Sequence, residues 1–191
     1  MSDVVIGPDK LARCPWVGSA QDYVEYHDLE WGRPLKGDDA LFERVCLEAF
    51  QSGLSWLTIL RKRPAFRAAY AGFSIAKVAE FDDKDVARLL ADEGIVRNRA
   101  KIAASINNAR AAAALPDGLS ALIWAHAPKP GPAPRGTDKI PAVTDASTAL
   151  AKALKKAGFS FVGPTTCYAL MQACGLVNDH LADCHVRLAA R

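Results

Sequence analysis

No stretch of this sequence contains the roughly 18 consecutive apolar residues that a membrane-spanning helix needs. Its beginning shows no basic and apolar leader, and we therefore expect a soluble, cytoplasmic protein with no membrane partner. A large excess of one charge is also missing, because 24 Lys and Arg residues stand against 21 Asp and Glu residues, a formal net charge of +3. This mildly basic balance permits a polyanionic partner but does not require one.

Alternation of apolar and polar residues, the pattern of half-buried strands, is scarce, and no internal repeat is present. The 191 residues are 50% apolar, which is enough for the core of one domain or of two small lobes. Helical periodicity and helix caps predict an all-α fold with helices near residues 38–50, 54–60, 75–81, 82–92, 98–114, 144–158 and 164–175. We expect the second helix to stop before Pro64, and Asp82 with Asp85 to form a capping box. Residues 128–137 are rich in proline and predict a mobile surface loop.

Cysteine and histidine are few, but four of them stand in two pairs near opposite ends of the chain. Cys14 and His27 lie near the start, and His180 and Cys184 lie four residues apart near the end. Sulfur and imidazole ligands suit tetrahedral zinc, which would then join the two ends of one domain. The alternative is that these residues are ordinary buried core residues, and spacing alone does not decide between the two. The remaining cysteines, Cys46, Cys167 and Cys174, have apolar neighbours and are expected in the core.

A tight connection between two predicted helices occurs at residues 89–102, LLADEGIVRNRAKI. Gly94 would let the chain turn, and the free backbone N–H groups that open the second helix could receive a phosphate. Arg97, Arg99 and Lys101 add positive charge there. This pattern favours a helix-hairpin-helix that contacts DNA independently of sequence, although an ordinary helix pair with solvated basic residues fits the pattern too.

Aromatic residues are dense around the first Cys/His pair: Trp16, Tyr23, Tyr26 and Trp31 lie close together, and Trp56 follows further on. They are either core residues or the walls of a pocket. Glu48 is equally ambiguous at this stage. It could form an exposed ion pair with Arg44, four residues earlier, or it could be a half-buried carboxylate in a ligand pocket.

Six segments in a fixed order carry a further signal: RCPWV, YVEYHDLEWG, LEAFQSGLSWLTIL, GIVRNRAKI, LKKAGFSFVG and CYALMQACGLVNDH. Together they resemble the type I 3-methyladenine DNA glycosylases of bacterial base-excision repair. The resemblance covers the chain from about Arg13 to Cys184, and only residues 1–12 and the proline-rich loop look specific to this sequence.

The resemblance implies an all-α helix-hairpin-helix glycosylase domain over residues 13–187, with two helical lobes and the helix-hairpin-helix near 84–114. Residues 1–12 would be a flexible extension and residues 188–191 a tail. It also implies one structural Zn²⁺, with the ligands Cys14, His27, His180 and Cys184. Gly94, Arg97, Arg99 and Lys101 would contact the DNA.

By the same resemblance, the protein would be a monomer that acts on double-stranded DNA containing alkylated adenine. It would flip 3-methyladenine out of the duplex, hydrolyse its N-glycosidic bond, and leave free 3-methyladenine and an abasic site. Glu48 would be the catalytic residue, Tyr26 and Trp56 would contact the base with it, and Trp16, Tyr23 and Trp31 would line the pocket.

Many helix-hairpin-helix relatives carry a catalytic Asp after the hairpin, but this chain has no Asp between Asp92 and Asp117. The group that activates water therefore stays unassigned. No lysine is a convincing Schiff-base nucleophile, so we expect a monofunctional enzyme without a lyase step. Two alternatives remain: a DNA-binding module joined by zinc that recognises alkylated DNA without cutting it, and a zinc hydrolase, against which four candidate ligands argue.

Overall fold

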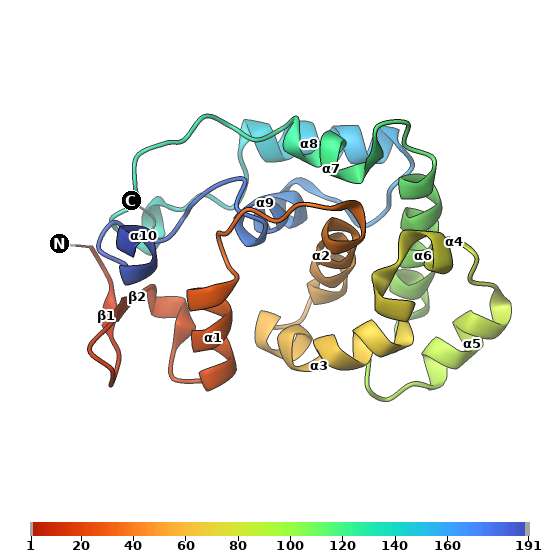
Figure 1. Ribbon diagram of the computed structural model, residues 1–191, viewed down its shortest axis with the longest axis horizontal. Helices are drawn as coiled ribbons and strands as arrows, with labels where there is room; N and C mark the ends of the chain where they lie inside the picture. Colours follow the sequence, from red (N-terminus) through yellow and green to blue (C-terminus); the bar gives the residue numbers. More distant parts are fainter. Residues whose placement is uncertain (1, 190–191) are drawn as a thin grey trace.

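The protein is built almost entirely from helices in the computed structural model, which describes residues 2–189 (Figure 1). The α-helices of this part of the chain are α1 Gln21–Leu29, α2 Asp38–Gln51, α3 Trp56–Ala69, α4 Ile75–Ala79, α5 Asp83–Ala91, α6 Arg99–Ala113, α7 Gly118–Trp124, α8 Asp145–Lys156, α9 Pro164–Ala173 and α10 His185–Ala189. The short 3₁₀ helices are η1 Pro15–Val17, η2 Ala71–Phe73 and η3 Thr137–Lys139. Strands β1 Val5–Ile6 and β2 Ala12–Arg13 form one antiparallel hairpin. The prediction of a mostly helical chain is confirmed.

Local hydrogen bonds explain where several helices begin. The Asp82 carboxylate accepts from the first turn of α5, and the Asp85 carboxylate accepts from the backbone N–H of Asp82 in return, so the predicted capping box is confirmed. Thr144 and Ser147 form the same reciprocal pair at the start of α8. A cap of this kind stabilises a helix by about 1 kcal/mol.

The predicted end of the second helix before Pro64 is wrong, because α3 continues through this residue. Proline has no backbone N–H, so the carbonyl of Leu60 loses its helical partner, at a cost of about 3 kcal/mol. Packing after Pro64 offsets this cost. Phe66 is fully buried in the core, and the guanidinium of Arg67 lies 2.8 Å from the carboxylate of Glu43 on α2.

Helix α7 is not predicted by the sequence, because its first turn is capped from a distant part of the chain. The backbone N–H of Ser120 donates to the Asp38 carboxylate of α2 at 2.7 Å, across 82 positions of sequence. The β1–β2 hairpin and α10 are likewise too short to show a periodic pattern.

Helix α2 forms the centre of the larger hydrophobic core and packs against α3, α4, α6, α7 and α9. Its buried apolar side chains are Leu41, Phe42, Val45, Cys46, Leu47 and Phe50. The cysteines expected in the core, Cys46, Cys167 and Cys174, do lie in this cluster. A smaller cluster connects α1 to the C-terminal segment, and Trp56 and Ile140 pack against both clusters.

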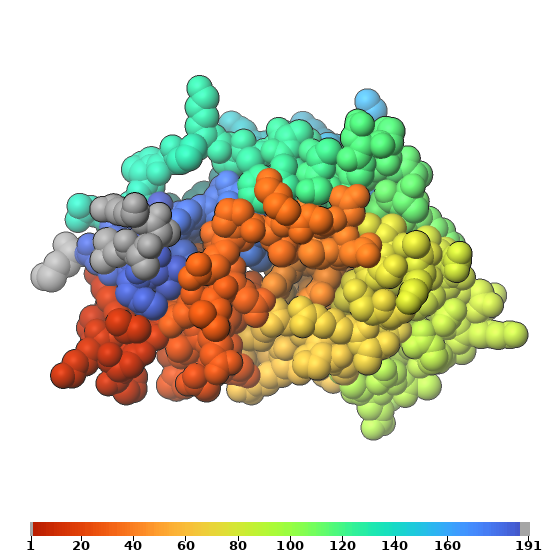
Figure 2. Space-filling model, in the orientation of Figure 1, coloured from red at the N-terminus to blue at the C-terminus, as the bar shows by residue number. Residues whose placement is uncertain are grey.

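The two ends of the chain meet at one side of the molecule, where Figure 2 shows the red N-terminal and dark blue C-terminal segments together. The backbone N–H and the hydroxyl of Ser2 both donate to the Asp183 carboxylate, at 3.0 and 2.9 Å. The Asp3 N–H donates to the Arg135 carbonyl, and the Ala182 N–H to the Pro134 carbonyl. Hydrogen bonds therefore tie both the N-terminal segment and the end of the proline-rich loop to the rest of the fold.

Several predicted boundaries fall in this region. Residues 2–12, expected as a flexible extension, contain β1 and part of the hairpin, while residue 1 lies outside the described residues. The expected tail, residues 188–191, begins inside α10, and residues 190–191 also lie outside the described part. Mobility of the loop at 128–137 stays a prediction. Within residues 2–189, no helix is both long and apolar enough to cross a membrane.

The connection between α1 and α2 is seated on the end of α9. The Gly32 N–H donates to the Gln172 carbonyl and the Leu35 N–H to the Cys174 carbonyl, at 3.1 and 3.0 Å. Gly175 makes this close approach possible, because its φ is +72° and a Cβ there would lie 2.4 Å from the backbone carbon of Arg33. This contact places α1 and α9 on two sides of the same cavity.

We expect Gly175→Ala to destabilise the protein by about 1–3 kcal/mol, because the new Cβ collides with backbone and the positive φ is strained. The measurement is the midpoint of thermal unfolding, followed by circular dichroism. Gly131→Ala is the matched control, since no atom lies within 4 Å of its Cβ position. Equal midpoints for the two variants would contradict the proposed close contact.

Candidate functional site

A cavity of about 430 Å³ opens between α1, α2, α3 and α9. All the aromatic residues that the sequence singles out line it, together with Glu48, and the full lining is Trp16, Tyr23, Tyr26, Trp31, Glu48, Gln51, Trp56, Thr137, Ile140, Ala169, Gln172 and Ala173. The polar residues Gln51, Thr137 and Gln172 were not foreseen from the sequence. They come from separate elements, and no short motif marks them.

The aromatic walls hold one another in place by edge contacts. Trp16 lies edge-on to Tyr23 and Trp31, with ring centroids 5.5 and 5.0 Å apart. Tyr26 and Trp56 are tilted at 46° with centroids 5.4 Å apart. Tyr26 and Trp31 are buried in the smaller core and also face the cavity, so the core and pocket interpretations both apply to them. Rings packed in this way form a rigid apolar slot for a flat ligand.

Glu48 is the only acidic residue among those that line this cavity. It sits on α2 with 6% of its surface exposed, and its carboxylate has no hydrogen-bond partner among the described residues. Burial raises the pKa of Glu48 to about 8, and the positive charge of Arg44 opposes this rise. Arg44 does not pair with Glu48, because its Nη2 donates to Glu30 at 2.6 Å. The geometry thus favours the pocket carboxylate over the surface ion pair.

A second polar group in the wall lacks a partner. The indole Nε1 of Trp56 is buried and has no acceptor among the described residues. An unpaired buried N–H group costs about 1–3 kcal/mol, so its presence is more easily explained where a ligand or water supplies an acceptor. Glu48 and Trp56 together offer the cavity one negative group and one donor.

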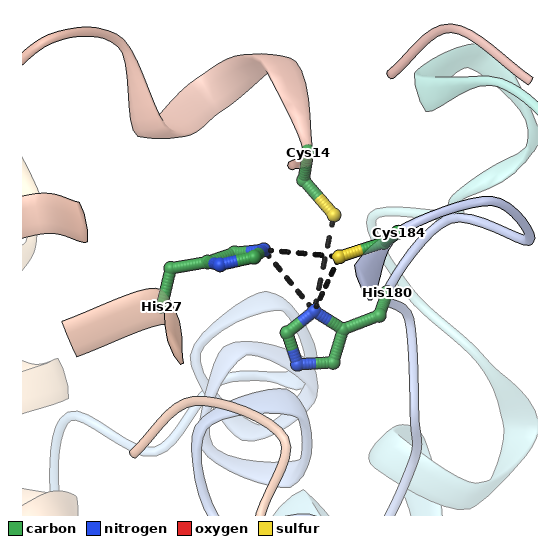
Figure 3. A group of neighbouring side chains, drawn as sticks. All are labelled: Cys14, His27, His180 and Cys184. Carbon is green, nitrogen blue, oxygen red and sulfur yellow. Dashed lines mark hydrogen bonds between the residues drawn. The ribbon is translucent and has the colours of Figure 1, made fainter. Parts of the chain in front are cut away.

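Next to the cavity, the two Cys/His pairs come together, although they lie at opposite ends of the sequence (Figure 3). All four residues are buried, and one ligand atom from each lies within 4.8 Å of the others. His180 Nδ1 lies 3.2 Å from His27 Nε2, 3.6 Å from Cys184 Sγ and 3.9 Å from Cys14 Sγ, and His27 Nε2 lies 3.5 Å from Cys184 Sγ. Zinc bonds of about 2.0–2.3 Å give tetrahedral edges of roughly 3.3–3.8 Å, so the donor set fits this ion.

Neighbouring hydrogen bonds set the protons on both imidazoles. His27 Nδ1 lies 2.7 Å from the Asp28 carboxylate, and His180 Nε2 lies 3.0 Å from the Trp31 carbonyl. A carboxylate and a carbonyl only accept, so these ring nitrogens are the donors. The other two nitrogens then face each other with lone pairs at 3.2 Å, which is repulsive unless a cation lies between them. This arrangement is typical of histidines oriented for a metal.

The Cys/His cluster is also connected to the backbone that carries the cavity wall. The backbone N–H of Leu181 donates to Cys14 Sγ at 3.4 Å, while hydrogen bonding with Cys184 raises the pKa of Cys14. Hydrogen bonding with Cys14 lowers the pKa of Cys184. Tyr26 directly precedes His27, and the Trp31 carbonyl accepts from His180. The Cys/His cluster therefore fixes two residues of the cavity wall.

The predicted hairpin is the turn between α5 and α6, and the structure corrects two residues there. Gly94 does not have a positive φ. A glycine is needed at this position because a Cβ there would lie 2.9 Å from the Cβ of Ala65 on α3. Lys101 does not face solvent: its Nζ donates to the carbonyls of Phe50 and Ser52, at 2.9 and 2.6 Å. Lys101 thus caps the end of α2, and the expectation that it contacts DNA does not agree with this position.

Arg97 and Arg99 are exposed at the same turn, as a surface contact requires. Arg97 lies 3.6 Å from Glu93, but both side chains are largely open to solvent, so this pair is weak. These two arginines are the cations of the predicted hairpin that remain available to a partner.

Comparison with known proteins gives a consistent result. The family model described as methyladenine glycosylase matches residues 16–187. The chain is 45% identical over 178 residues to the DNA-3-methyladenine glycosylase of Haemophilus influenzae and 47% identical over 180 residues to DNA-3-methyladenine glycosylase 1 of Escherichia coli. These alignments cover 90% and 91% of this chain and 96% of each relative.

Solved structures agree. A crystal structure of 3-methyladenine DNA glycosylase I is similar with a TM-score of 0.87 and 48% identity, over 91% of this chain and 98% of that one. A variant of such an enzyme in complex with 3-methyladenine is similar with a TM-score of 0.86 and 36% identity, over 91% of this chain and 96% of that one.

Burial of Glu48 has a consequence for stability. The carboxyl loses its proton near pH 4.5 in the unfolded chain but only near about 8 in the folded protein. Between these values the folded state binds the additional proton, so the free energy of unfolding falls as the pH rises through this window. We expect Glu48→Gln to remove this fall and to exceed the wild type in stability at about pH 8, by up to a few kcal/mol.

Urea unfolding of both proteins across the window measures this difference, and Glu25→Gln, at an exposed position on α1, is the control. Parallel pH profiles for the wild type and Glu48→Gln would contradict a raised pKa for this carboxyl.

Proposed function

The chain belongs to the methyladenine glycosylase family, and from this premise we propose that it is a DNA-repair enzyme that excises 3-methyladenine from alkylated double-stranded DNA. It hydrolyses the N-glycosidic bond and leaves free 3-methyladenine and an abasic site. The observation that carries this proposal is the unpaired, buried carboxylate of Glu48 inside a cavity walled by aromatic rings. The relatives named 3-methyladenine DNA glycosylases support the substrate.

The cavity has the chemistry that this substrate requires. Methylation at N3 makes adenine in DNA a cation, and an enzyme must flip the nucleotide out of the duplex to reach it. Tyr26 and Trp56 offer π faces to a cationic base, and Glu48 offers a negative charge. A neutral base gains much less from these groups. The arriving cation also favours the ionised form of Glu48, so binding and deprotonation support each other.

The bond to be broken is already weak, because the departing base takes the bonding electron pair and becomes neutral. Water attacks C1′ of the sugar and its excess proton passes to the solvent, while the protein mainly positions the base and stabilises charge. The residues that line the cavity include no lysine that could attack C1′. We therefore propose a monofunctional enzyme in which Glu48 recognises the charged base and stabilises it as the bond lengthens.

For the metal, we propose one structural Zn²⁺ held by Cys14, His27, His180 and Cys184. The donor types, their separations and the facing lone pairs of the imidazoles support zinc, and four protein ligands leave no open position for a substrate. The ion would hold the N-terminal and C-terminal segments together and thereby fix the wall that contains Tyr26 and Trp31. It takes no part in the hydrolysis.

For the DNA contact, we propose that α5, α6 and the turn between them act as a helix-hairpin-helix. The N-terminal turn of α6 presents backbone N–H groups, and Arg97 and Arg99 are exposed beside it. Such contacts bind phosphates without reading sequence and weaken with salt. The protein would work as a monomer in the cytoplasm, with residues 13–187 as the catalytic domain.

The first test is release of base from methylated duplex DNA, with 3-methyladenine and 7-methylguanine resolved by chromatography. We expect the wild type to release 3-methyladenine selectively, and Glu48→Gln to release it at least about tenfold more slowly, because one charged contact to the departing base is lost. Circular dichroism checks that the variant is folded. A folded wild type that binds alkylated DNA but releases no base would instead identify a non-enzymatic DNA-binding module.

Zinc is tested separately with Cys184→Ser. We expect this variant to lose metal content and stability together, because the binding energy of a structural metal is partly folding energy. Elemental analysis and thermal unfolding are the two measurements. Cys167→Ser, a buried cysteine outside the cluster, is the control for loss of a core thiol. Full metal content at wild-type stability in Cys184→Ser would refute the four-ligand site.

A further inference from the structure

Arg44 and Glu48 lie four residues apart on α2, a spacing at which opposite charges normally pair, but they do not pair here. The Nη1 of Arg44 is buried and has no acceptor among the described residues. The carboxylate of Glu48 has no donor. A buried donor therefore remains unpaired one helical turn from a cavity-lining carboxylate, although opposite charges at this spacing normally pair. Some other contact must therefore hold the guanidinium in its place.

Glu30, the residue that follows the last residue of α1, provides that contact. Its carboxylate accepts from Arg44 Nη2 at 2.6 Å and from both arms of Arg63 at 2.6 and 2.7 Å. Burial raises the pKa of Glu30, but the hydrogen bonds from Arg63 and Arg44 outweigh this and lower it to about 2. Glu30 is thus an ionised carboxylate that holds the Nη2 side of the Arg44 guanidinium.

We propose that Glu30 and Arg44 are positioning residues for the pocket carboxylate. Glu30 holds the Arg44 guanidinium where its charge favours ionised Glu48 but where it does not occupy the oxygens that the substrate base needs. Without Glu30, the guanidinium would swing one turn along α2 and pair with Glu48. This inference rests on the proposed function, because it assumes that the unpaired carboxylate of Glu48 binds the substrate base.

Arg44 is the charged neighbour of Glu48 among the described residues. Tyr26 on α1 and Cys174 at the end of α9 also face the carboxylate. Burial raises the pKa of Tyr26 above its usual range and that of Cys174 to about 12, so both are neutral. Among the described residues, Arg44 is the charged group that acts on Glu48, and its positive charge lowers the pKa of Glu48.

The experiment compares Glu30→Gln, Arg44→Met and the double variant with the wild type. Arg63→Met is the matched control, because it removes an arginine from Glu30 but leaves the Glu30–Arg44 pair intact. The ligand is 3,9-dimethyladeninium, which carries the charge of the substrate base without the sugar. Binding is measured by quenching of the tryptophans that line the cavity, and release of 3-methyladenine from methylated DNA is measured in parallel. Circular dichroism confirms that each variant is folded.

In Glu30→Gln we expect the affinity for the cation to fall at least about tenfold, since Arg44 then occupies Glu48. In the Arg44→Met background the same substitution should have no further effect. Arg63→Met should bind the cation like the wild type.

The pH dependence separates the two single variants. Glu48 has a pKa of about 8 with Arg44 in place, and Arg44→Met removes the charge that lowers it. The affinity of this variant should therefore be weaker than that of the wild type at neutral pH and should recover only at a higher pH than the wild type needs. Glu48 in Glu30→Gln is ionised but paired, so raising the pH should not restore binding. The Arg44→Met arm of this test stands even where Glu30→Gln does not fold.

Wild-type affinity in Glu30→Gln, an equal loss in Arg63→Met, additive losses in the double variant, or no recovery of Arg44→Met at high pH would each overturn the inference. Failure of the proposed function is a different result: the wild type would release no 3-methyladenine, whatever the variants do in the binding assay.

Discussion

The contact on which the candidate site depends is the meeting of Cys14 and His27 with His180 and Cys184. It joins segments that are 166 positions apart, and the N-terminal segment carries Trp16, Tyr23, Tyr26 and Trp31 of the cavity wall. The imidazole of His180 also donates to the Trp31 carbonyl, and His27 directly follows Tyr26 in the chain. The apolar cluster between α1 and the C-terminal segment is smaller than the main core, so we expect the Cys/His cluster to supply much of the stability there.

Helix α2 carries two kinds of buried residue with opposite effects on the stability of the fold. Leu47 and Phe50 are fully buried and stabilise the core, whereas Glu48, between them, is a buried carboxylate that lowers stability at neutral pH. Lys101 closes the end of this helix by donating to its last carbonyls. The site is therefore built on the helix at the centre of the larger core, where packing on several sides holds an unfavourable group in place.

What the sequence could and could not predict follows from the range of each interaction. Capping boxes such as Asp82 with Asp85 involve neighbours in the chain, and so they can be read directly. The end of α3 and the start of α7 depend on Phe66 in the core and on Asp38 in another helix, and local propensity misses both. Glu48 and the Cys/His pairs were found by residue type and resemblance. Arg44 was named only as the alternative ion-pair partner of Glu48, and Glu30 was not singled out, because the absence of that ion pair is visible only in three dimensions. Lys101 was misjudged for the same reason, since basic residues on helices usually face solvent.

The split of the Cys/His cluster between the two ends has a consequence for how the protein is made. During synthesis the chain leaves the ribosome from its N-terminus, and Cys14, His27 and the aromatic residues near them emerge long before His180 and Cys184. Most helices of the larger core around α2 are synthesised early. The cavity wall, in contrast, can form only after nearly the whole chain has left the ribosome. A nascent chain stalled before residue 180 would hold one thiol ligand, Cys14, and one imidazole ligand, His27, without their partners. Its pocket would be incomplete.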